Sequence, residues 1–190
     1  MVLGLFKGRK RGGNPPADGT IETRPMGEDS EDGYVPTQEE LARAEPIPPV
    51  GEWWNPEDVG LTWEEAGWPL VVRHEWKPRR ARSYGRYFRD VLWLPGYKLG
   101  FHGMVWANGR IYLVDGATLS ILHEADGTKT AYEIVEKVAT SYIEYLPDDD
   151  SLKMAFTKEN PSEDEKKEVR GFFSALFFQM ALLKKKGLLS

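Results

Sequence analysis

Cysteine is absent from all 190 residues of the sequence. Its absence excludes disulfides, thiolate metal sites and cysteine nucleophiles, and nothing in the composition indicates an oxidising compartment. Long apolar runs are absent too, because no stretch approaches the roughly 20 residues of a membrane-spanning helix. We therefore expect a cytoplasmic protein. The length allows one domain of about 100 to 150 residues with a smaller appendage.

Residues typical of catalytic sites are few. The three histidines, His74, His102 and His123, lie in three different segments, and an isolated histidine is more often a packed or surface residue than a base or a ligand. His102 is the most suggestive, because the neighbouring Gly100 and Gly103 would let the backbone approach another group closely. The sequence has no glycine-rich phosphate loop, no His-x-x-x-His pair and no Gly-x-Ser-x-Gly motif. We expect neither an enzyme, nor a cofactor, nor a metal site.

The first 60 residues hold eight of the 13 prolines and nine of the 19 glycines. A segment so rich in helix breakers buries too little apolar surface to offset its chain entropy. We expect a long, largely irregular arm over residues 1–60 that wraps a partner, with one short helix at Thr37 to Ala44 that starts with a capping box. Residues 1–11 combine apolar and basic side chains and favour, at most, weak contact with a membrane surface.

Residues 61–96 form an expected linker that is rich in tryptophan and arginine, with a short strand at Leu70 to Val72. Tryptophan is common at interfaces because one ring buries a large area with little loss of rotamer freedom. The candidate contacts with a partner are Trp63 in this linker and Trp53 and Trp54 shortly before it. Packing of the arm onto the C-terminal domain is the alternative.

Basic and aromatic residues are interleaved between Arg73 and Arg89, with a single acidic residue, Glu75, among them. This combination is typical of segments that bind single strands or acidic partners. The candidate contacts with an anionic partner are Arg79, Arg80, Arg82 and Arg86. Pairing with the chain's own acidic arm is the alternative.

A β-hairpin is expected from Lys98 to Asp115. Its turn is Asn108-Gly109, the dipeptide that best supplies the positive backbone angles of a two-residue turn. On the strand before this turn, Met104 and Trp106 alternate with Val105 and Ala107, so the two pairs are expected on opposite faces.

Three helices are expected after the hairpin. The first begins after Asp115 and ends at Asp126-Gly127, and the second begins at a capping box at Thr130. The third runs from Glu163 to Lys186 behind another capping box, and its apolar stripe is broad enough to cover a partner. The expected fold is α+β: residues 97–190 form a winged helix-turn-helix-like domain, a β-hairpin followed by three helices.

This order of hairpin, helix, turn, helix and long helix is accompanied by short motifs along the last half of the chain. They are Gly116-Ala117, Ile121-Leu122, Asp126-Gly127-Thr128, Thr130, Glu133-Ile134, Tyr142 and Lys186-Gly187-Leu188-Leu189. In these features the chain from about Lys98 to Ser190 resembles the PqqD-like family, whose members are small winged helix-turn-helix domains that recognise peptides. The acidic stretch from Pro147 to Pro161 and the arm before residue 97 lie outside the family pattern.

The resemblance implies that an extended peptide pairs with the outer strand of the hairpin and packs against the third helix. An exposed strand edge offers unpaired amides and carbonyls, and a groove beside it selects side chains. The residues of these two elements that we expect to bind a peptide or partner are Arg110, Tyr112, Val114, Phe173, Phe177 and Met180.

The charges of the helix-turn-helix do not favour a nucleic-acid partner. Its second helix carries Glu133, Glu136 and Glu144 against Lys137, and the formal net charge of the chain is -5. We expect a non-catalytic accessory or scaffold subunit that docks a peptide or a protein partner in a hetero-oligomeric assembly. The alternatives are a chaperone that binds the leader peptide of a peptide-modifying enzyme, and a nucleic-acid-binding regulator.

Overall fold

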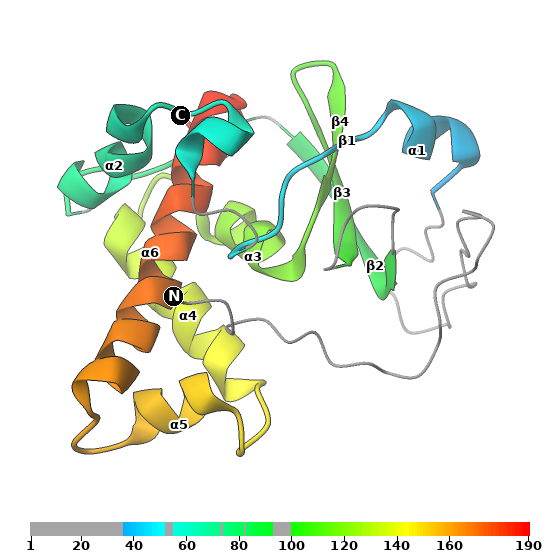
Figure 1. The fold of residues 1–190 in the computed structure, drawn as a ribbon. Coiled ribbons are helices and arrows are strands. Elements are labelled where there is room, and N and C mark those ends of the chain that lie inside the picture. The colour runs from blue at the N-terminus through cyan, green and yellow to red at the C-terminus, as the bar shows by residue number, and fades with distance from the viewer. Residues whose placement is uncertain (1–35, 52–54, 73, 82, 93–99) are drawn as a thin grey trace.

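The computed structural model describes residues 36–51, 55–72, 74–81, 83–92 and 100–190, and for residues 68–72 and 83–92 it describes the backbone alone. They form a mixed fold of helices and a small sheet, which is compatible with the predicted α+β class. In chain order the elements are α1 (Gln38–Arg43), β1 (Glu45–Pro46), the 3-10 helix η1 (Pro56–Val59), α2 (Trp63–Val72), β2 (Ser83–Leu92), β3 (Phe101–Ala107), β4 (Arg110–Val114), α3 (Gly116–Glu124), α4 (Ala131–Glu144), α5 (Ser151–Thr157) and α6 (Glu163–Lys185) (Figure 1). Within this part of the chain no helix is both long and apolar enough to cross a bilayer.

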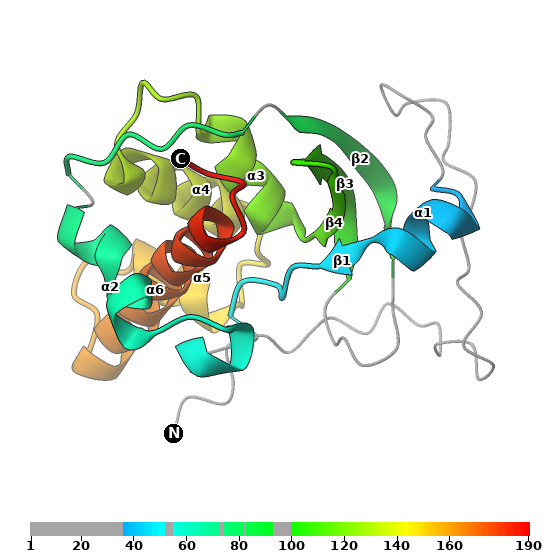
Figure 2. The same cartoon turned by 90° about the horizontal axis from the view of Figure 1, so that it is seen from above.

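The four strands pair in the order β1-β4-β3-β2. The predicted hairpin is confirmed as β3 and β4, and its turn residues Asn108 and Gly109 have φ values of 53° and 75°. β2 pairs antiparallel with β3 at one edge of the sheet. At the other edge β1 runs parallel to β4, with Glu45 opposite Tyr112. β4 is therefore an inner strand, with the arm beside it (Figure 2).

The two faces of the hairpin contact two apolar clusters, because side chains alternate along a strand. Val105 and Val114 belong to the large core, which also contains residues of α3, α4 and α6. Met104 and Leu113 belong to a smaller cluster on the other face, together with Leu41 of α1. α1 is the short helix predicted in the arm, and its capping box is present.

Helix α6 is central to the helical part of the fold, and α2, α4 and α5 pack against it (Figure 1). The predicted helix starts are confirmed by their caps: Asp115 caps α3, Thr130 caps α4 and Ser162 caps α6. Each cap accepts a hydrogen bond from an amide that has no partner inside the helix. Gly187, with a φ of 72°, follows the end of α6.

Several elements differ from the sequence predictions. The expected strand at Leu70 to Val72 is wrong, since these residues end α2; a short apolar run fits a strand or a packed helix equally well. β2 lies in the basic and aromatic segment, and α5 lies in the acidic stretch, so four helices follow the hairpin instead of three. In the arm, the two-residue strand β1 is an element that the sequence does not predict.

The large core contains residues from the predicted arm and the predicted linker as well as from residues 100–190. Ile47 and Val50 come from the arm, and Leu61 and Ala66 come from the linker; all four are 2 % exposed or less. The described parts of the chain thus share one main core.

Candidate polypeptide-binding site

Residues 45–50, Glu-Pro-Ile-Pro-Pro-Val, lie between β4 and α6 and are named the arm segment. The segment extends the pairing of β1 with β4, because the Ile47 amide donates to the Leu113 carbonyl at 2.9 Å. It then passes over α6 toward η1 (Figure 2). The expectation of an open outer hairpin edge is therefore wrong: the chain's own arm pairs with it. The residues that hold the segment are named the arm site: Arg110, Leu113, Asp115, Gln179 and Lys186.

Half of the side chains of the arm segment are buried. Ile47 is 0 % exposed and Val50 is 2 % exposed, and Pro49 is buried as well. Both aliphatic residues belong to the large core. Burying such a side chain stabilises the folded state by about 1.5 to 3 kcal/mol, so apolar contact contributes strongly to holding the segment.

Asp115 holds the last residue of the arm segment. One of its carboxylate oxygens accepts from the Thr118 amide at 2.9 Å, as the cap of α3, and the other accepts from the Val50 amide at 3.2 Å. Burial raises the pKa of Asp115, and the hydrogen bonds from Thr118 and Val50 oppose that rise. A buried carboxylate is costly unless it is hydrogen-bonded, so the Val50 amide is one of the partners that Asp115 requires.

Gln179 holds the middle of the arm segment. Its side chain is buried, and its Nε2 donates to the Pro48 carbonyl at 3.0 Å and to the Thr118 hydroxyl at 2.9 Å. The Thr118 side chain in turn donates to Asp115. Asp115, Thr118 and Gln179 therefore form one buried polar network, and two of its contacts are main-chain groups of the arm segment.

Glu45, the first residue of the arm segment, lies between two cations. Its carboxylate forms a close ion pair with Lys186, just after α6, and lies 3.8 Å from the guanidinium of Arg110. The Arg110 side chain is 68 % exposed. An exposed pair of this kind contributes at most about 1 kcal/mol, so Glu45 adds less than the buried aliphatic residues.

His102, the histidine that the sequence favours as functional, lies close to this network. Its half-buried ring packs on Gly116, where a Cβ atom would come within 2.8 Å of Nδ1. Burial lowers the pKa of His102, and the negative charge of Asp115 opposes that shift. Thr118 is 0 % exposed and cannot serve as an accessible nucleophile beside it. Among the described residues no group of three or more histidine, aspartate or glutamate side chains is placed to hold a metal ion.

The residues predicted to bind a peptide lie around the arm segment or in the core. Tyr112, Val114 and Met180 are 1 % exposed or less, and Phe177 is 3 % exposed. Phe173 is half-buried. Tyr112, Val114, Phe177 and Met180 are therefore closed to a peptide partner in this structure, whereas Phe173 is partly accessible.

The tryptophans predicted to contact a partner are described only in part. Trp63, at the start of α2, is 62 % exposed and accessible to a partner. Trp53 and Trp54 lie outside the described residues.

The arginines predicted to contact an anionic partner include two that lie across the turn between α3 and α4. The Arg80 amide donates to the Ala125 carbonyl at 2.8 Å, and the Ser190 amide donates to the Arg79 carbonyl at 2.9 Å. The side chains of Arg79 and Arg80 are exposed. The remaining predicted positions, Arg82 and the side chain of Arg86, lie outside the described part of the chain.

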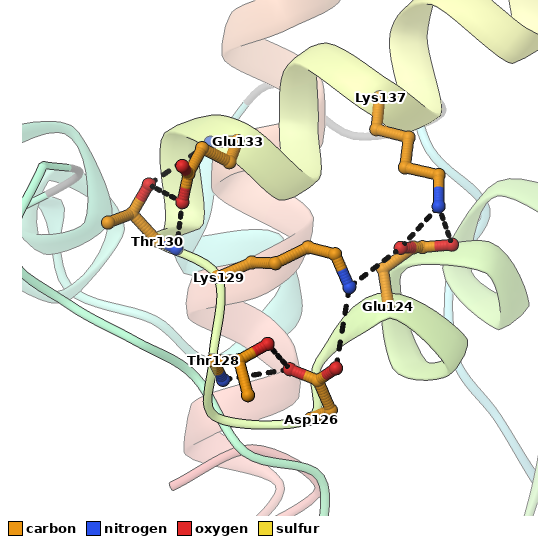
Figure 3. Close-up of polar contacts among 7 residues, drawn as sticks. All are labelled: Glu124, Asp126, Thr128, Lys129, Thr130, Glu133 and Lys137. Carbon is orange, nitrogen blue, oxygen red and sulfur yellow. Dashed lines mark hydrogen bonds and ion pairs between the residues drawn. The ribbon is translucent and has the colours of Figure 1, made fainter.

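The turn between α3 and α4 pairs its own charges. Lys137 lies 2.8 Å from Glu124, and Lys129 lies 3.3 Å from Glu124 and 3.4 Å from Asp126 (Figure 3). The hydrogen bond from Lys137 is the main cause that lowers the pKa of Glu124, and hydrogen bonds from Thr128 lower the pKa of Asp126. Lys129 in the turn and Lys137 in α4 are thus both partly neutralised, which opposes their contact with phosphates.

Several residues of the arm site and arm segment are missed by sequence reasoning. Gln179 carries a signal: it lies seven positions after the buried Phe172, on the same face of α6, where a polar residue is unexpected. Ile47 and Val50 carry another, as aliphatic residues three positions apart, one between prolines and one directly after them. Asp115 is recognised only as a helix start, because its second contact is with a residue 65 positions away.

No family model, curated protein or solved structure matches this chain. A functional conclusion therefore depends on the geometry of the arm site.

Proposed function

We propose that this chain is a non-catalytic protein-binding subunit whose C-terminal domain, of the winged helix-turn-helix type found in PqqD-like proteins, holds extended polypeptide segments in the arm site. The proposal depends on two buried side chains, Asp115 and Gln179, that bond to main-chain groups of the arm segment. Main-chain groups are common to every peptide, and addition of an extended segment beside a strand is a recurrent mode of recognition. The order of hairpin, α3, α4 and α6 supports the same type of domain.

The site requires an occupant. Without the arm segment, Asp115 would lose its contact with Val50, Gln179 would lose its contact with Pro48, and the apolar surface around Ile47 would meet water. A segment of another polypeptide with the same contacts would satisfy these groups equally well. It must displace the tethered arm, which competes at a roughly millimolar effective concentration.

Exchange of this kind suits an accessory or scaffold subunit of a larger assembly, in which a partner's segment replaces the arm and the released arm wraps the partner. A leader-peptide chaperone is the second candidate, and a leader peptide would have to displace the arm segment in the same way.

The proposal is tested with a fluorescent peptide of residues 36–51 and the full-length variant Ile47→Asp. The charge at a position that is 0 % exposed expels the tethered arm, because a buried carboxylate without a partner is strongly disfavoured. Fluorescence anisotropy is expected to show binding to the variant at least about tenfold tighter than to the wild-type chain.

The matched control is the same peptide carrying Ile47→Asp, which is expected to bind neither protein. Circular dichroism establishes that the variant keeps its helices. A folded variant that leaves the parent peptide unbound would contradict the proposed function.

A further inference from the structure

We infer that the arm site selects its occupant by a proline pattern: the partner is another polypeptide that carries an extended segment with an acidic residue, a proline, an aliphatic residue, two prolines and a second aliphatic residue. This is the pattern of Glu45 to Val50. The inference rests on the proposed binding function and names the class of segment that is bound.

The backbone amides of the arm segment match the hydrogen-bond acceptors of the site. From position 46 to position 50 only Ile47 and Val50 have an N–H group, since the other three residues are prolines. The site provides an acceptor for each of these two amides, the Leu113 carbonyl at 2.9 Å and the Asp115 carboxylate at 3.2 Å. The pattern of prolines thus matches the pattern of acceptors, and any other residue at a proline position would bring an additional N–H group that needs a partner.

The prolines also fix the shape that the site binds. Proline restricts its own φ and keeps the residue before it extended, so a proline-rich segment has less entropy to lose when it binds. Gln179 donates a hydrogen bond to the Pro48 carbonyl at 3.0 Å. Proline lacks an N–H group but keeps its carbonyl, so this contact is compatible with proline at position 48. Pro49 is buried, so its ring contributes apolar contact as well.

The two aliphatic positions set the register. Ile47 and Val50 are three residues apart and are both inserted into the large core. The amide of each is also the one that the site bonds. A shift by one residue would bring either Pro46 and Pro49 or Pro48 and Gly51 to these positions. Either shift removes both inserted aliphatic side chains and at least one of the two hydrogen bonds. Gly51, with a φ of 83°, then turns the chain away, so the pattern ends at Val50.

The acidic position sets the direction of the occupant. Lys186 and Arg110 lie at the end of the site that holds Glu45, whereas Asp115 lies at the end that holds Val50. A segment with an acidic residue at its first position and an amide at its last therefore fits in one direction only.

The inference is tested with a set of peptides of residues 36–51 on the full-length Ile47→Asp variant. Relative to the parent peptide, Ile47→Ala in the peptide is expected to weaken binding about 100-fold, because the site loses a buried side chain. The double change Pro48→Ala and Pro49→Ala is expected to weaken it about tenfold through the added N–H groups and the lost restriction. Glu45→Gln is expected to weaken it about threefold.

Outcomes for the two proposals are separable. If the parent peptide binds and the double alanine peptide binds equally well, the proline pattern is refuted while the proposed function stands. If no peptide binds the folded variant, the proposed function itself is refuted. The wild-type chain could instead form a concentration-dependent dimer that Ile47→Asp abolishes. That result would show that the site binds a second copy of this chain, and it would contradict the inference that the partner is a different polypeptide. Should Ile47→Asp not fold, the same ranking is measured on the wild-type chain at higher peptide concentration, where the peptides compete with the tethered arm.

Discussion

Two segments from the first half of the chain pack against residues 100–190, and they are held in different ways. The arm segment inserts Ile47 and Val50 into the core, and buried side chains of the domain bond to its backbone. Residues 79–81 lie between the turn after α3 and the C-terminal residues, where their main chain forms hydrogen bonds while the Arg79 and Arg80 side chains remain exposed.

The difference indicates which segment is selected by its sequence. A segment held through its side chains is replaced only by a similar segment, whereas one held through its main chain tolerates most substitutions. The arm site is therefore the candidate for recognition, and the contact of residues 79–81 is a tether that keeps the linker on the domain.

The largest expected effect on stability is at Ile47. Ile47→Ala should lower the free energy of unfolding by about 3 kcal/mol, because it leaves a cavity in the core. This loss in free energy is measured by urea denaturation with circular dichroism as the signal. The control is Met154→Ala, since Met154 is 50 % exposed and its truncation should change the free energy by no more than about 0.5 kcal/mol. Equal losses in the two variants would mean that the arm segment is not packed as described.

A smaller effect, with a distinctive dependence on pH, is expected at Asp115. The carboxyl has an ordinary pKa of 3.8, and burial raises it in the folded state. Between these two values the folded chain keeps a proton that the unfolded chain has released. The stability that this group contributes is therefore fully present below pH 3.8 and is lost as the pH rises through the folded pKa.

Asp115→Asn removes this titration and keeps a good helix cap. The difference in unfolding free energy between wild type and variant should shift in favour of the variant as the pH rises across that window, and then stay constant. Urea titrations at a series of pH values measure the difference. A difference that does not change with pH would show that the buried carboxyl is not perturbed by its position beside the arm segment.

The parts of the fold that the sequence predicts are those with local signals. The capping boxes at Thr37, Thr130 and Ser162 and the turn at Asn108 each depend on residues within four positions of one another. Such signals are complete in a short window of sequence, so they are read correctly without knowledge of the rest of the fold.

The parts that the sequence does not predict depend on distant contacts. β1 pairs for only two residues, and its neighbour β4 lies more than 60 positions away. β2 is rich in aromatic residues, which favour strands. The arginines between them also fit a surface that binds an anionic partner, and that is the function predicted for this segment. The contact of Gln179 with Pro48 spans 131 positions. The sequence alone therefore does not explain why a polar side chain is buried at position 179.

The smallest expected effect is at Arg80, and it tests whether residues 79–81 are held by their main chain. Arg80→Ala should change the free energy of unfolding by less than about 0.5 kcal/mol, because the side chain is exposed. Arg80→Pro should lower it by about 1 kcal/mol, because proline removes the amide that donates to the Ala125 carbonyl at 2.8 Å. Thermal denaturation of the two variants side by side measures the contrast. If alanine and proline were equally harmful, the arginine side chain would be the group that is held, and residues 79–81 would become a second candidate for selective recognition.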